Sequence, residues 1–433
     1  MILIARMREG DNRMKSVIFN KSLNEKEEYD VIVCGGGVAG CAAAYSAAKR
    51  GMKTILFEKS TMLGGLATLG LINLFVPMCN GRGKQIIFGL CEKWCRMSAM
   101  LGYDTIPKEW RDGEPKEATT VRYTQRFAHG IFALQLMGEL DSIGVKIMYD
   151  CAVADAIVEE NRVTGVVING KNGLELYTAK VVIDTTGDSD LTRRAGAPTT
   201  DGENYFTYST KSITLDGCKK AVEEKNIRLA YSGIGGGTAN LHGKGHPEDV
   251  PKWAGTTPED VNAYLISNQR IVLSKLKPEE RFERDIAMIP GMPQFRTTCH
   301  INGEHTFTVD DAYRHFDTSI GAICDFERRD YLYEVPYGTL YSKDFPNLLA
   351  AGRCASAEGY GWDVLRVIPP AIITGQAAGE AAAIAVEDSV PVSEVDIKKL
   401  QDRLSEENVM IHFPDELIPK SEGGEHAPAD GHV

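Results

Sequence analysis

The feature that most constrains this chain is a glycine-rich corner near its N-terminal end. The apolar run 30–34 ends in the pattern G-x-G-x-x-G over 35–40, and small residues follow as a predicted helix. Residues 53–58 then predict a second strand, whose last residue is Glu58. A strand, a glycine turn, a helix and a second strand that ends in an acid are the parts of a dinucleotide-binding βαβ unit.

Each residue of this corner has a physical reason to be there. Gly35 permits a tight turn out of the strand, Gly37 lets the backbone approach a pyrophosphate, and Gly40 lets the helix pack closely on the strand. The free N–H groups and the positive dipole end of the helix favour phosphate. Glu58 can accept hydrogen bonds from the hydroxyls of a ribose.

Length and charge narrow the class of protein. The chain has 433 residues, enough for two or three domains or for one large domain with insertions. Its net charge is −12 and nothing basic is concentrated in the sequence, so we expect neither nucleic acid nor membrane as a partner. The first fifteen residues hold too few consecutive apolar residues for a signal peptide. The uncharged run 63–79 contains glycines, Asn73 and Pro77, which predicts a buried loop rather than a membrane span.

The cysteines and histidines do not form a chemical motif. Ten cysteines are too dilute for a disulfide scaffold, and no C-x-x-C pair occurs, so we expect a reducing cytoplasm. Cys91 and Cys95 are spaced i,i+4 on a predicted helix, which leaves a redox or metal pair as a minor alternative. No H-x-x-H pattern predicts a metal site, and no G-x-S-x-G elbow predicts a hydrolase.

Three separated segments are predicted to supply strands to one parallel sheet. The first is the βαβ unit. The second begins with a predicted helix at 119–143 and ends in an apolar strand that reaches Gly187, with short strands between them around 145–148, 152–159, 162–169 and 174–179. The third is a strand over 347–351 that stops at Gly352, followed by a loop and by a helix that begins at Pro369-Pro370.

The long stretch 200–335 does not continue this pattern. It has an alternating segment at 206–215, a helical one at 257–276 and several glycine-rich loops, which predicts an inserted α+β substrate domain. Gly233-Ile234-Gly235-Gly236-Gly237 superficially resembles a second dinucleotide loop. Neither an apolar strand nor a strand-end acid flanks it, so we predict a flexible loop there.

The predicted organisation follows from these segments. We expect a partly ordered leader at 1–28, a first nucleotide-binding part at 29–199 with an insertion near 66–118, the substrate or cap domain at 200–335, a second nucleotide-binding part at 336–395, and a C-terminal helix with a loose tail at 396–433.

Several motifs together resemble one known family. They are Gly35–Gly40, Glu58-Lys59, Gly64-Gly65, Thr185–Asp188, Leu349–Arg353, Arg366–Pro370 and Gly375–Gly379. The chain is similar in these to the FAD-dependent oxidoreductases of the glutathione-reductase-type superfamily, near the branch of the fumarate reductase flavoproteins and the FAD subunit of heterodisulfide reductase. The resemblance spans about 29–390, thinly between 200 and 290. It implies a Rossmann-like, α/β FAD-binding domain built from discontinuous segments.

The resemblance also implies how FAD is held. The pyrophosphate would rest on the glycine corner, the adenosine ribose on Glu58, and the flavin against the start of the proline-initiated helix, whose dipole stabilises negative charge by roughly 0.3–2 kcal/mol. No histidine follows the double glycine, so we expect non-covalent FAD. The implied FAD-binding residues are Gly35, Gly37, Val38, Ala39, Gly40, Glu58, Lys59, Gly64, Gly65, Ala152, Val153, Thr186, Gly187, Gly352, Arg353, Pro370 and Ala371.

Three residues are candidates for the chemistry above the flavin. Arg366 matches an arginine of the family and suits a substrate carboxylate or an anionic flavin, although a salt bridge to Asp363 explains it equally well. Arg296 matches the first arginine of the family's substrate-side strand. His300 can exchange protons near neutrality, with an ordinary hydrogen-bonded histidine as the alternative. Cys299 and His300 stand where relatives often carry an arginine pair, which leaves the substrate class open.

These observations predict a FAD-dependent oxidoreductase that passes hydride or electrons between the flavin and a small-molecule substrate. No second dinucleotide fold is evident, so we do not expect a built-in NAD(P)H domain. External NAD(P)H or a redox partner protein would then be a further partner. Two alternatives stay open: an electron-transfer subunit of a larger complex, and a flavoprotein that uses FAD structurally or for non-redox chemistry.

Overall fold

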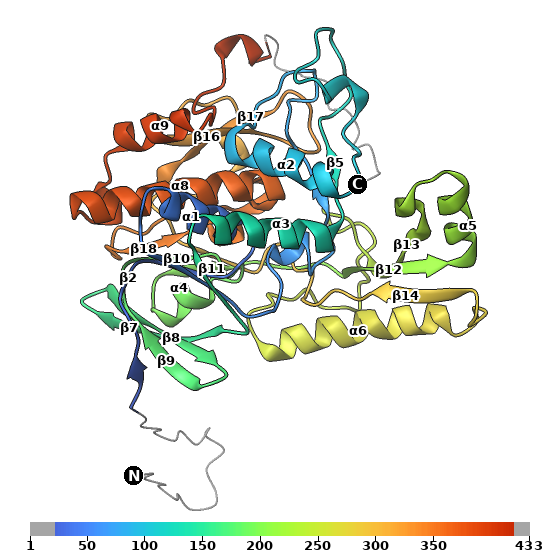
Figure 1. The fold of residues 1–433 in the computed structure, drawn as a ribbon, viewed down its shortest axis with the longest axis horizontal. Coiled ribbons are helices and arrows are strands. Elements are labelled where there is room, and N and C mark those ends of the chain that lie inside the picture. The colour runs from blue at the N-terminus through green and yellow to red at the C-terminus, as the bar shows by residue number, and fades with distance from the viewer. Residues whose placement is uncertain (1–21, 420–433) are drawn as a thin grey trace, which may run out of the picture.

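The central sheet has five parallel strands and is assembled from distant parts of the chain (Figure 1). The computed structural model describes residues 22–419, so most of the predicted leader and the predicted tail lie outside the described residues. The strand order is β18-β10-β2-β3-β6. Their bounds are β2 (Tyr29–Cys34), β3 (Thr54–Glu58), β6 (Lys146–Tyr149), β10 (Ala179–Asp184) and β18 (Leu348–Ala350). The predicted α/β fold and its three strand-bearing segments are confirmed.

Side chains of the central strand β2 alternate between two cores. Val31 and Val33 belong to the large core beneath the helices, whereas Ile32 and Cys34 belong to a second core on the opposite face. Because successive side chains of a strand point to opposite faces, a continuous apolar run is what a strand covered on both sides requires.

Helices cover one face of the sheet and two of them interlock. These are α1 (Val38–Lys49), α2 (Gly89–Leu101), α3 (His129–Ser142) and α8 (Ile368–Asp388). A Cβ on Gly375 would lie 2.2 Å from the carbonyl oxygen of Ala39, and one on Gly379 would lie 2.3 Å from that of Ala43. The backbones of α1 and α8 therefore touch directly, and only glycine fits at these two positions.

A four-stranded sheet covers the other face. Its order is β1-β9-β8-β7, with strands β1 (Asn24–Glu25), β7 (Ala152–Glu159), β8 (Arg162–Gly170) and β9 (Gly173–Tyr177). Val163, Val166 and Ile168 of β8 pack in the same core as Ile32 and Ile55 of the central sheet. Strand β1 pairs in parallel with β9, which ties residues just before β2 to this layer.

The cap has its own small core. Strands β12 (Thr207–Thr214), β13 (Tyr231–Thr238) and β14 (Arg284–Met288) pack against α6 (Pro258–Leu276), with α5 (Leu215–Glu223) at the outer end (Figure 1). Its core is aromatic and includes Phe206, Trp253, Tyr264 and Phe295. Ile320 and Val335 of the later strands β16 (Ser319–Cys324) and β17 (Leu332–Pro336) join the large core instead. The domain limits given above stay predictions.

The predicted helix at 119–143 is too long. Helix α3 begins only at His129, because residues before it are used in extended contacts. Strand β5 (Gln125–Arg126) pairs with β4 (Leu74–Phe75), and the indole N–H of Trp110 donates to the carbonyl of Val121. The prediction from periodicity included these residues in the helix, because periodicity does not reveal such extended contacts.

Two segments predicted as loops are regular elements. The glycine run 233–237 lies in strand β13, where a Cβ on Gly237 would come within 2.3 Å of the carbonyl oxygen of Phe206. These glycines allow close packing rather than flexibility. Residues Gly359–Arg366, predicted as a loop before the proline-initiated helix, form helix α7. The remaining elements are α4 (Asp190–Arg194), α9 (Ile397–Glu406), β11 (Thr199–Asp201) and β15 (Cys299–Ile301).

Across residues 22–419, none of the helices combines the length and the apolar character that a membrane crossing requires.

Candidate cofactor-binding site

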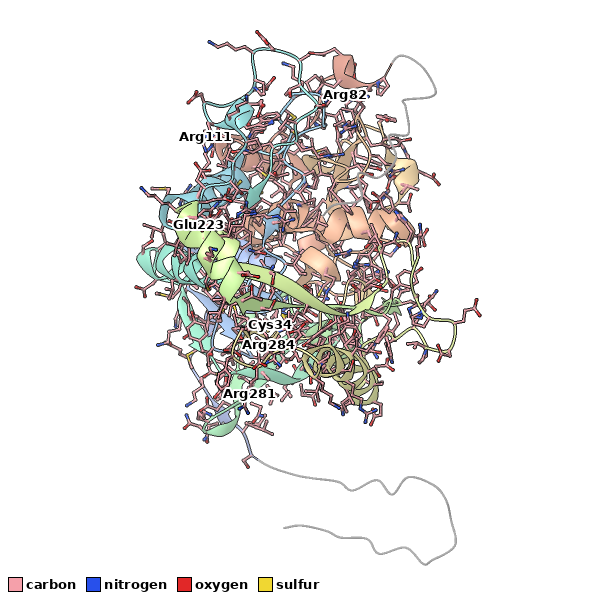
Figure 2. All side chains as sticks on the ribbon, turned by 90° about the vertical axis from the view of Figure 1, so that its right-hand side faces the viewer. Cys34, Arg82, Arg111, Glu223, Arg281 and Arg284 are labelled. Atoms are coloured by element: carbon pink, nitrogen blue, oxygen red, sulfur yellow. The ribbon has the colours of Figure 1, made fainter. Side chains whose placement is uncertain are left out.

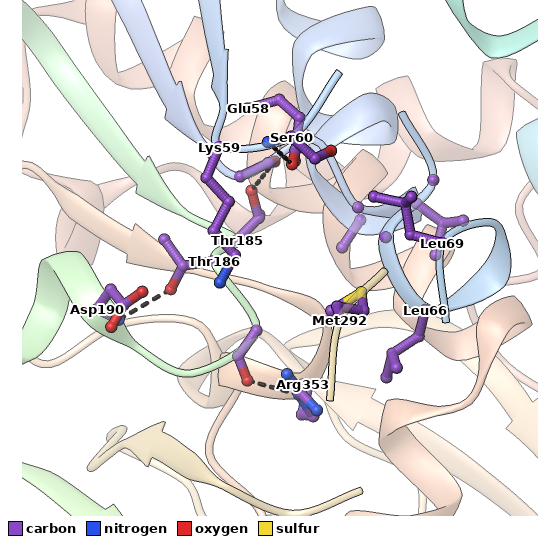
Figure 3. Close-up of a pocket in the computed structure, with 18 of the residues that line it drawn as sticks. Glu58, Lys59, Ser60, Leu66, Leu69, Thr185, Thr186, Asp190, Met292 and Arg353 are labelled. Carbon is purple, nitrogen blue, oxygen red and sulfur yellow. Dashed lines mark hydrogen bonds between the residues drawn. The ribbon is translucent and has the colours of Figure 1, made fainter. Parts of the chain in front are cut away.

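A cavity of about 510 Å³ lies at the carboxyl ends of the central strands (Figure 3). All three strand-bearing segments contribute to it, and so does the loop 291–292 at the cap. Its volume is within the range of small-molecule and cofactor sites. Its lining includes most of the predicted FAD-binding residues: Gly35, Gly37, Val38, Ala39, Glu58, Lys59, Gly64, Gly65, Ala152, Val153, Thr186, Gly187, Gly352, Arg353 and Ala371.

The geometry of the glycine corner gives each glycine a distinct role. Gly35 has a φ of +105°, which glycine adopts readily, and its missing Cβ would lie 2.4 Å from the carbonyl oxygen of Thr185. A Cβ on Gly40 would lie 1.9 Å from the carbonyl oxygen of Gly35. Gly40 is therefore a packing residue and does not line the cavity. A Cβ on Gly37 would meet nothing within 4 Å, because it would project into open space.

The start of helix α1 offers hydrogen-bond donors to that space. The first helical bond runs from the Cys41 N–H to the carbonyl of Gly37, so the N–H groups of Val38, Ala39 and Gly40 precede the first intrahelical bond. Val38 and Ala39 line the cavity. Donors and a positive helix end at an open cradle suit a diphosphate.

Glu58 stands at the end of β3, where an acid for a ribose is expected. Only 7% of its surface is exposed, and its carboxylate accepts the N–H groups of Gly36 and Ser60, each at 2.7 Å. A carboxylate has about four lone-pair directions, so these two bonds fix its orientation and leave acceptor capacity for hydroxyl groups.

The second glycine pair is held against the first. The Gly64 N–H donates to the carbonyl of Gly36 at 2.8 Å, and both Gly64 and Gly65 have positive φ values, +102° and +55°. A Cβ on Gly65 would lie 3.1 Å from Cα of Gly37. The double glycine thus brings a second stretch of backbone to the edge of the phosphate cradle.

Charged and apolar groups lie at different ends of the cavity. Lys59 and Asp190 lie at one end in Figure 3, and Leu66 and Leu69 at the other. Burial, followed by the charge of Asp188, raises the pKa of Asp190. The polar end suits the adenosine part of a dinucleotide, and the apolar end suits an aromatic ring.

The start of helix α8 forms part of the cavity wall. Ile368 and Ala371 line the cavity, whereas Pro370 does not. The N–H of Ala371 already donates to the carbonyl of Val367 at 2.9 Å, and the two prolines carry no N–H. This helix end therefore presents a dipole and an apolar surface with a single unpaired backbone donor, that of Ile368.

Arg353 lines the cavity but its donors are engaged within the protein. The side chain is 7% exposed; it donates to the Gly187 carbonyl at 2.6 Å and to the Asp188 carboxylate at 2.8 Å, and it also donates to the Phe295 carbonyl. These contacts join the second segment, the cap and the third segment. Its geometry is that of a clamp between them.

Of the three predicted catalytic residues, only Arg366 lines the cavity. Its Nε and Nη2 donate to Asp363 Oδ1 at 2.8 Å and 2.5 Å. Arg296 does not line the cavity; its Nη1 is buried and unpaired within the described part of the chain, and burial and the nearby Arg366 lower its pKa. His300 lies on β15 and is 4% exposed.

The surroundings of His300 are those of a packed histidine. Its Nδ1 lies 2.7 Å from the carbonyl oxygen of Ile301, its ring stands edge-on to Trp362, and burial lowers its pKa. It does not reach the cavity lining. Its part in proton transfer stays a prediction without a contact to support it.

Sequence reasoning missed the part of the site that the cap supplies. Gly291 and Met292 line the cavity, and the Gly291 N–H donates to the Leu69 carbonyl at 3.0 Å. The only signal in the sequence is a glycine and a methionine between two prolines, at 290–293. Other lining residues that it did not select are Phe57, Ser60, Leu66, Ala67, Leu69, Cys151, Thr185, Asp190, Arg194, Ala351 and Ile368.

Taken together, a parallel sheet, a glycine corner, a strand-end acid and a cavity across the carboxyl ends define a dinucleotide-binding protein of the flavoprotein type. The chain belongs to the FAD dependent oxidoreductase family, whose model matches residues 30–231 and 261–404. The expected cofactor, FAD, is the one of this family. The open space at Gly37 and the acceptor capacity of Glu58 fit it.

Individual relatives are similar over part of the chain. A thiamine thiazole synthase from Methanococcus vannielii is 32% identical over 43% of this chain and 72% of its own length. A thioredoxin reductase from Ureaplasma parvum is 24% identical over 36% of this chain and 53% of its own length. One of the thiazole synthases, from Pyrococcus horikoshii, is matched over 61% of its length. The fumarate reductase branch suggested above stays a prediction.

Among solved structures, one similar chain is a geranylgeranyl bacteriochlorophyll reductase-like protein from Thermoplasma acidophilum. It is 15% identical with a TM-score of 0.43, and the match covers 90% of this chain and 85% of that chain. Another is p-nitrophenol 4-monooxygenase from Pseudomonas putida, 13% identical with a TM-score of 0.43 over 88% and 84% of the two chains.

Replacing Glu58 with alanine should weaken FAD binding about ten- to a hundredfold, because a hydrogen bond to a charged group contributes about 1.5–3 kcal/mol. Fluorescence titration of the apoprotein with FAD measures the change. Glu159→Ala, at the exposed end of β7, is the control and should bind FAD as the parent does. Unchanged affinity in Glu58→Ala would show that this carboxylate does not hold the ribose.

A histidine cluster lies apart from the cavity. Although the sequence predicts no metal site, potential ligand atoms of His315, Glu334 and His412 lie within 4.8 Å of one another. The fully buried Glu334 carboxylate lies 2.5 Å from His315 Nδ1 and 2.9 Å from His412 Nδ1. These are hydrogen-bond distances, shorter than the roughly 3.3 Å between ligands that zinc bonds of about 2.0–2.1 Å imply. We interpret the cluster as a buried carboxylate held by two imidazoles, which fastens the 409–415 segment to strand β17.

This cluster predicts a pH dependence of stability. The Glu334 carboxylate, and then Asp415, raise the pKa of His315, so the folded state favours the charged imidazole. That stabilisation is present below the ordinary histidine pKa of about 6.5 and is lost as the pH rises through the raised value. The free energy of unfolding should fall as the pH rises above about 6.5, and less so in His315→Gln. Urea unfolding at several pH values measures it, with His242→Gln as control; parallel profiles for the parent and His315→Gln would contradict the assignment.

Proposed function

We propose that the protein is an oxidoreductase that holds FAD non-covalently in the 510 Å³ cavity and exchanges hydride or electrons with a small-molecule substrate at its apolar end. The observation that carries the proposal is the continuity of the lining, which runs from the glycine corner to Arg366 and the start of α8. Family membership supports the same reading.

Bound FAD would supply the hydride and electron chemistry. The chain's own residues would bind FAD, orient the substrate and shield the site from water. Leu66, Leu69 and Met292 exclude water from the apolar end (Figure 3). Arg366 is held in one direction by Asp363 and brings a permanent positive charge to the cavity, which suits a substrate carboxylate. The α8 dipole favours negative charge where the start of this helix lines the cavity.

Anaerobic reduction tests the proposal. Protein loaded with FAD should lose its yellow colour when a small-molecule reductant is added, and recover it with an oxidant. Reduction only in the presence of a second protein would favour an electron-transfer subunit instead. A flavin that no donor reduces would favour a structural or non-redox role. Flavin that stays attached after denaturation, measured by mass spectrometry, would contradict non-covalent binding.

Arg366→Gln should slow flavin reduction by the active reductant about ten- to a hundredfold, if the charge holds the substrate. FAD affinity should change little, which separates substrate binding from cofactor binding. Arg366→Lys keeps the charge and should recover part of the rate. Equal reduction rates in Arg366→Gln and in the parent protein would remove Arg366 from the substrate site.

We infer a reducing cytoplasm as the location, supported by the ten cysteines, none of which is paired in a disulfide within the described chain. Neither nucleic acid nor a membrane is proposed as a partner, in keeping with the net charge of −12. NAD(P)H or a redox protein is the proposed source or sink of electrons.

A further inference from the structure

A second cavity, of about 350 Å³, lies between the cap and the loop-rich insertion that precedes α3. One wall comes from Tyr103, Arg126 and His129, and the other from β12, α5, β13 and the turn before β13. The lining residues are Asn73, Tyr103, Arg126, His129, Lys211, Lys220, Arg228, Leu229, Tyr231, Ser232 and Gly233.

The charges of this lining are all of one sign. Four of the residues are lysine or arginine, one is histidine, and none of the described residues in the lining is aspartate or glutamate. The whole chain has 60 acidic residues against 48 basic ones. The lining of this cavity is therefore basic, although the chain as a whole is acidic. We call it the basic cavity.

The cations in the basic cavity repel one another. Burial lowers the pKa of Arg126, and the charge of Arg228 lowers it further. Burial and then Arg126 lower the pKa of Lys211, and burial and then Lys211 lower that of His129. Like charges that face one another at half-buried positions cost free energy unless an anion lies between them.

Among the described residues, few acidic side chains compensate the positive charges of the basic cavity. Within residues 22–419, Arg126, Lys211 and Arg228 have no acidic partner. Lys220 is the exception, since its Nζ lies 3.9 Å from Oε1 of Glu224, the residue that follows α5. His129 Nδ1 is buried without a hydrogen-bond partner in the described part of the chain. An anion bound in the cavity would supply the negative charge that the described residues do not.

The side chains specify which anion fits. Two guanidinium groups can each grip two oxygens of a phosphate, and an ammonium group adds a point charge. Asn73, Tyr103 and Ser232 add neutral polar groups for the rest of a ligand. The volume is that of a small-molecule site rather than of a single ion.

The basic cavity and the FAD cavity share two segments. Leu69 lines the FAD cavity and Asn73, four residues on, lines the basic cavity. Met292 lines the FAD cavity, and Met288 contacts His129 of the basic cavity. One loop and one strand end therefore touch both sites.

We propose that the basic cavity binds a phosphate-bearing small molecule, with Arg126 and Arg228 as the principal phosphate ligands. The proposal does not depend on FAD being bound. Such a ligand would neutralise the repulsion between the cap and the insertion and would hold the two together.

Calorimetric titration with inorganic pyrophosphate tests this, on protein supplied with excess FAD so that the glycine corner is filled. Binding should weaken as sodium chloride is raised. Arg126→Gln and Arg228→Gln should each weaken it roughly tenfold or more, since each removes a charged hydrogen-bond donor. Arg281→Gln is the matched control. Arg281, labelled in Figure 2, lies between α6 and β14 and does not line the basic cavity, so its replacement should leave binding unchanged.

Unfolding of the free protein gives a second readout. Arg228→Gln relieves repulsion, so without pyrophosphate it should be at least as stable as the parent, and with pyrophosphate it should gain less stability. This pattern separates a lost ligand contact from a damaged fold. No pyrophosphate binding, or binding that all three arginine variants retain, would overturn the proposal.

Two sources of phosphate are then distinguished with dinucleotides. NADP⁺ that competes with pyrophosphate, where NAD⁺ does not, would assign the cavity to the phosphate of an external hydride donor. Pyrophosphate binding with no competition from either dinucleotide would assign it to a phosphorylated metabolite. Both results support a phosphate site. The effects of Arg126→Gln and Arg228→Gln show whether that site is the basic cavity.

Discussion

Gly40→Ala is expected to destabilise the nucleotide-binding domain by about 3 kcal/mol, the upper part of the usual range for overpacking. The new Cβ would lie 1.9 Å from the Gly35 carbonyl oxygen and 2.5 Å from Thr185 Oγ1. Neither neighbour can move freely, because Gly35 turns the chain out of β2 and the Thr185 hydroxyl donates to backbone carbonyls at 2.8 Å and 3.0 Å. Urea unfolding followed by circular dichroism measures the loss.

Gly37→Ala is the matched control at the same corner. Gly37 has an ordinary φ of −65°, and its Cβ would meet no protein atom within 4 Å, so the free energy of unfolding of the apoprotein should stay close to that of the parent. FAD affinity should still fall, because the methyl group enters the cradle. If Gly40→Ala unfolded at the same urea concentration as Gly37→Ala, the packing role of Gly40 would be wrong.

Arg353→Met should destabilise the protein by about 3–5 kcal/mol, which is the usual cost of removing one partner of a buried charged pair. The substitution removes donors to the Gly187 and Phe295 carbonyls and leaves Asp188 without its cation. Because these contacts join three segments, the cap and the sheet should also loosen relative to each other, which limited proteolysis measures.

Arg194→Met is the control for Arg353→Met. Arg194 also lines the cavity, but it is 36% exposed and lies 3.7 Å from Asp190 on the same helix. Exposed pairs of this kind contribute about 0–1 kcal/mol. A similar loss of stability in both variants would mean that Arg353 is not a clamp.

Short-range patterns predicted the central part of the fold well. The glycine corner, β3 with its terminal Glu58, and the proline-initiated helix each depend on the preferences of a few neighbouring residues. These preferences act within one turn or one strand, so they can be read from the chain directly.

The features that depend on distant contacts were missed. Residues 233–237 form a strand because they pair with β12, and their glycines leave room for the close approach of α6 and β12. The chain before His129 is extended because it pairs with β4. The basic cavity combines residues 73–129 with residues 211–233, and no local pattern marks it. His315, Glu334 and His412 are likewise separated by up to 97 residues. They meet because β16 pairs with β17 and the 410–411 segment hydrogen-bonds to β16.

The direct backbone contact between α1 and α8 sets a condition on biosynthesis. Helix α1 leaves the ribosome well before its packing partner, because Gly375 and Gly379 are made more than 300 residues later. The nascent chain must keep the alanine-rich face of α1 covered, by a chaperone or by provisional contacts, until α8 has been translated. Because Ile368 and Ala371 of α8 line the FAD cavity, we expect FAD to bind only after α8 has been made. We also expect a chain truncated before α8 to aggregate rather than to form a smaller flavoprotein.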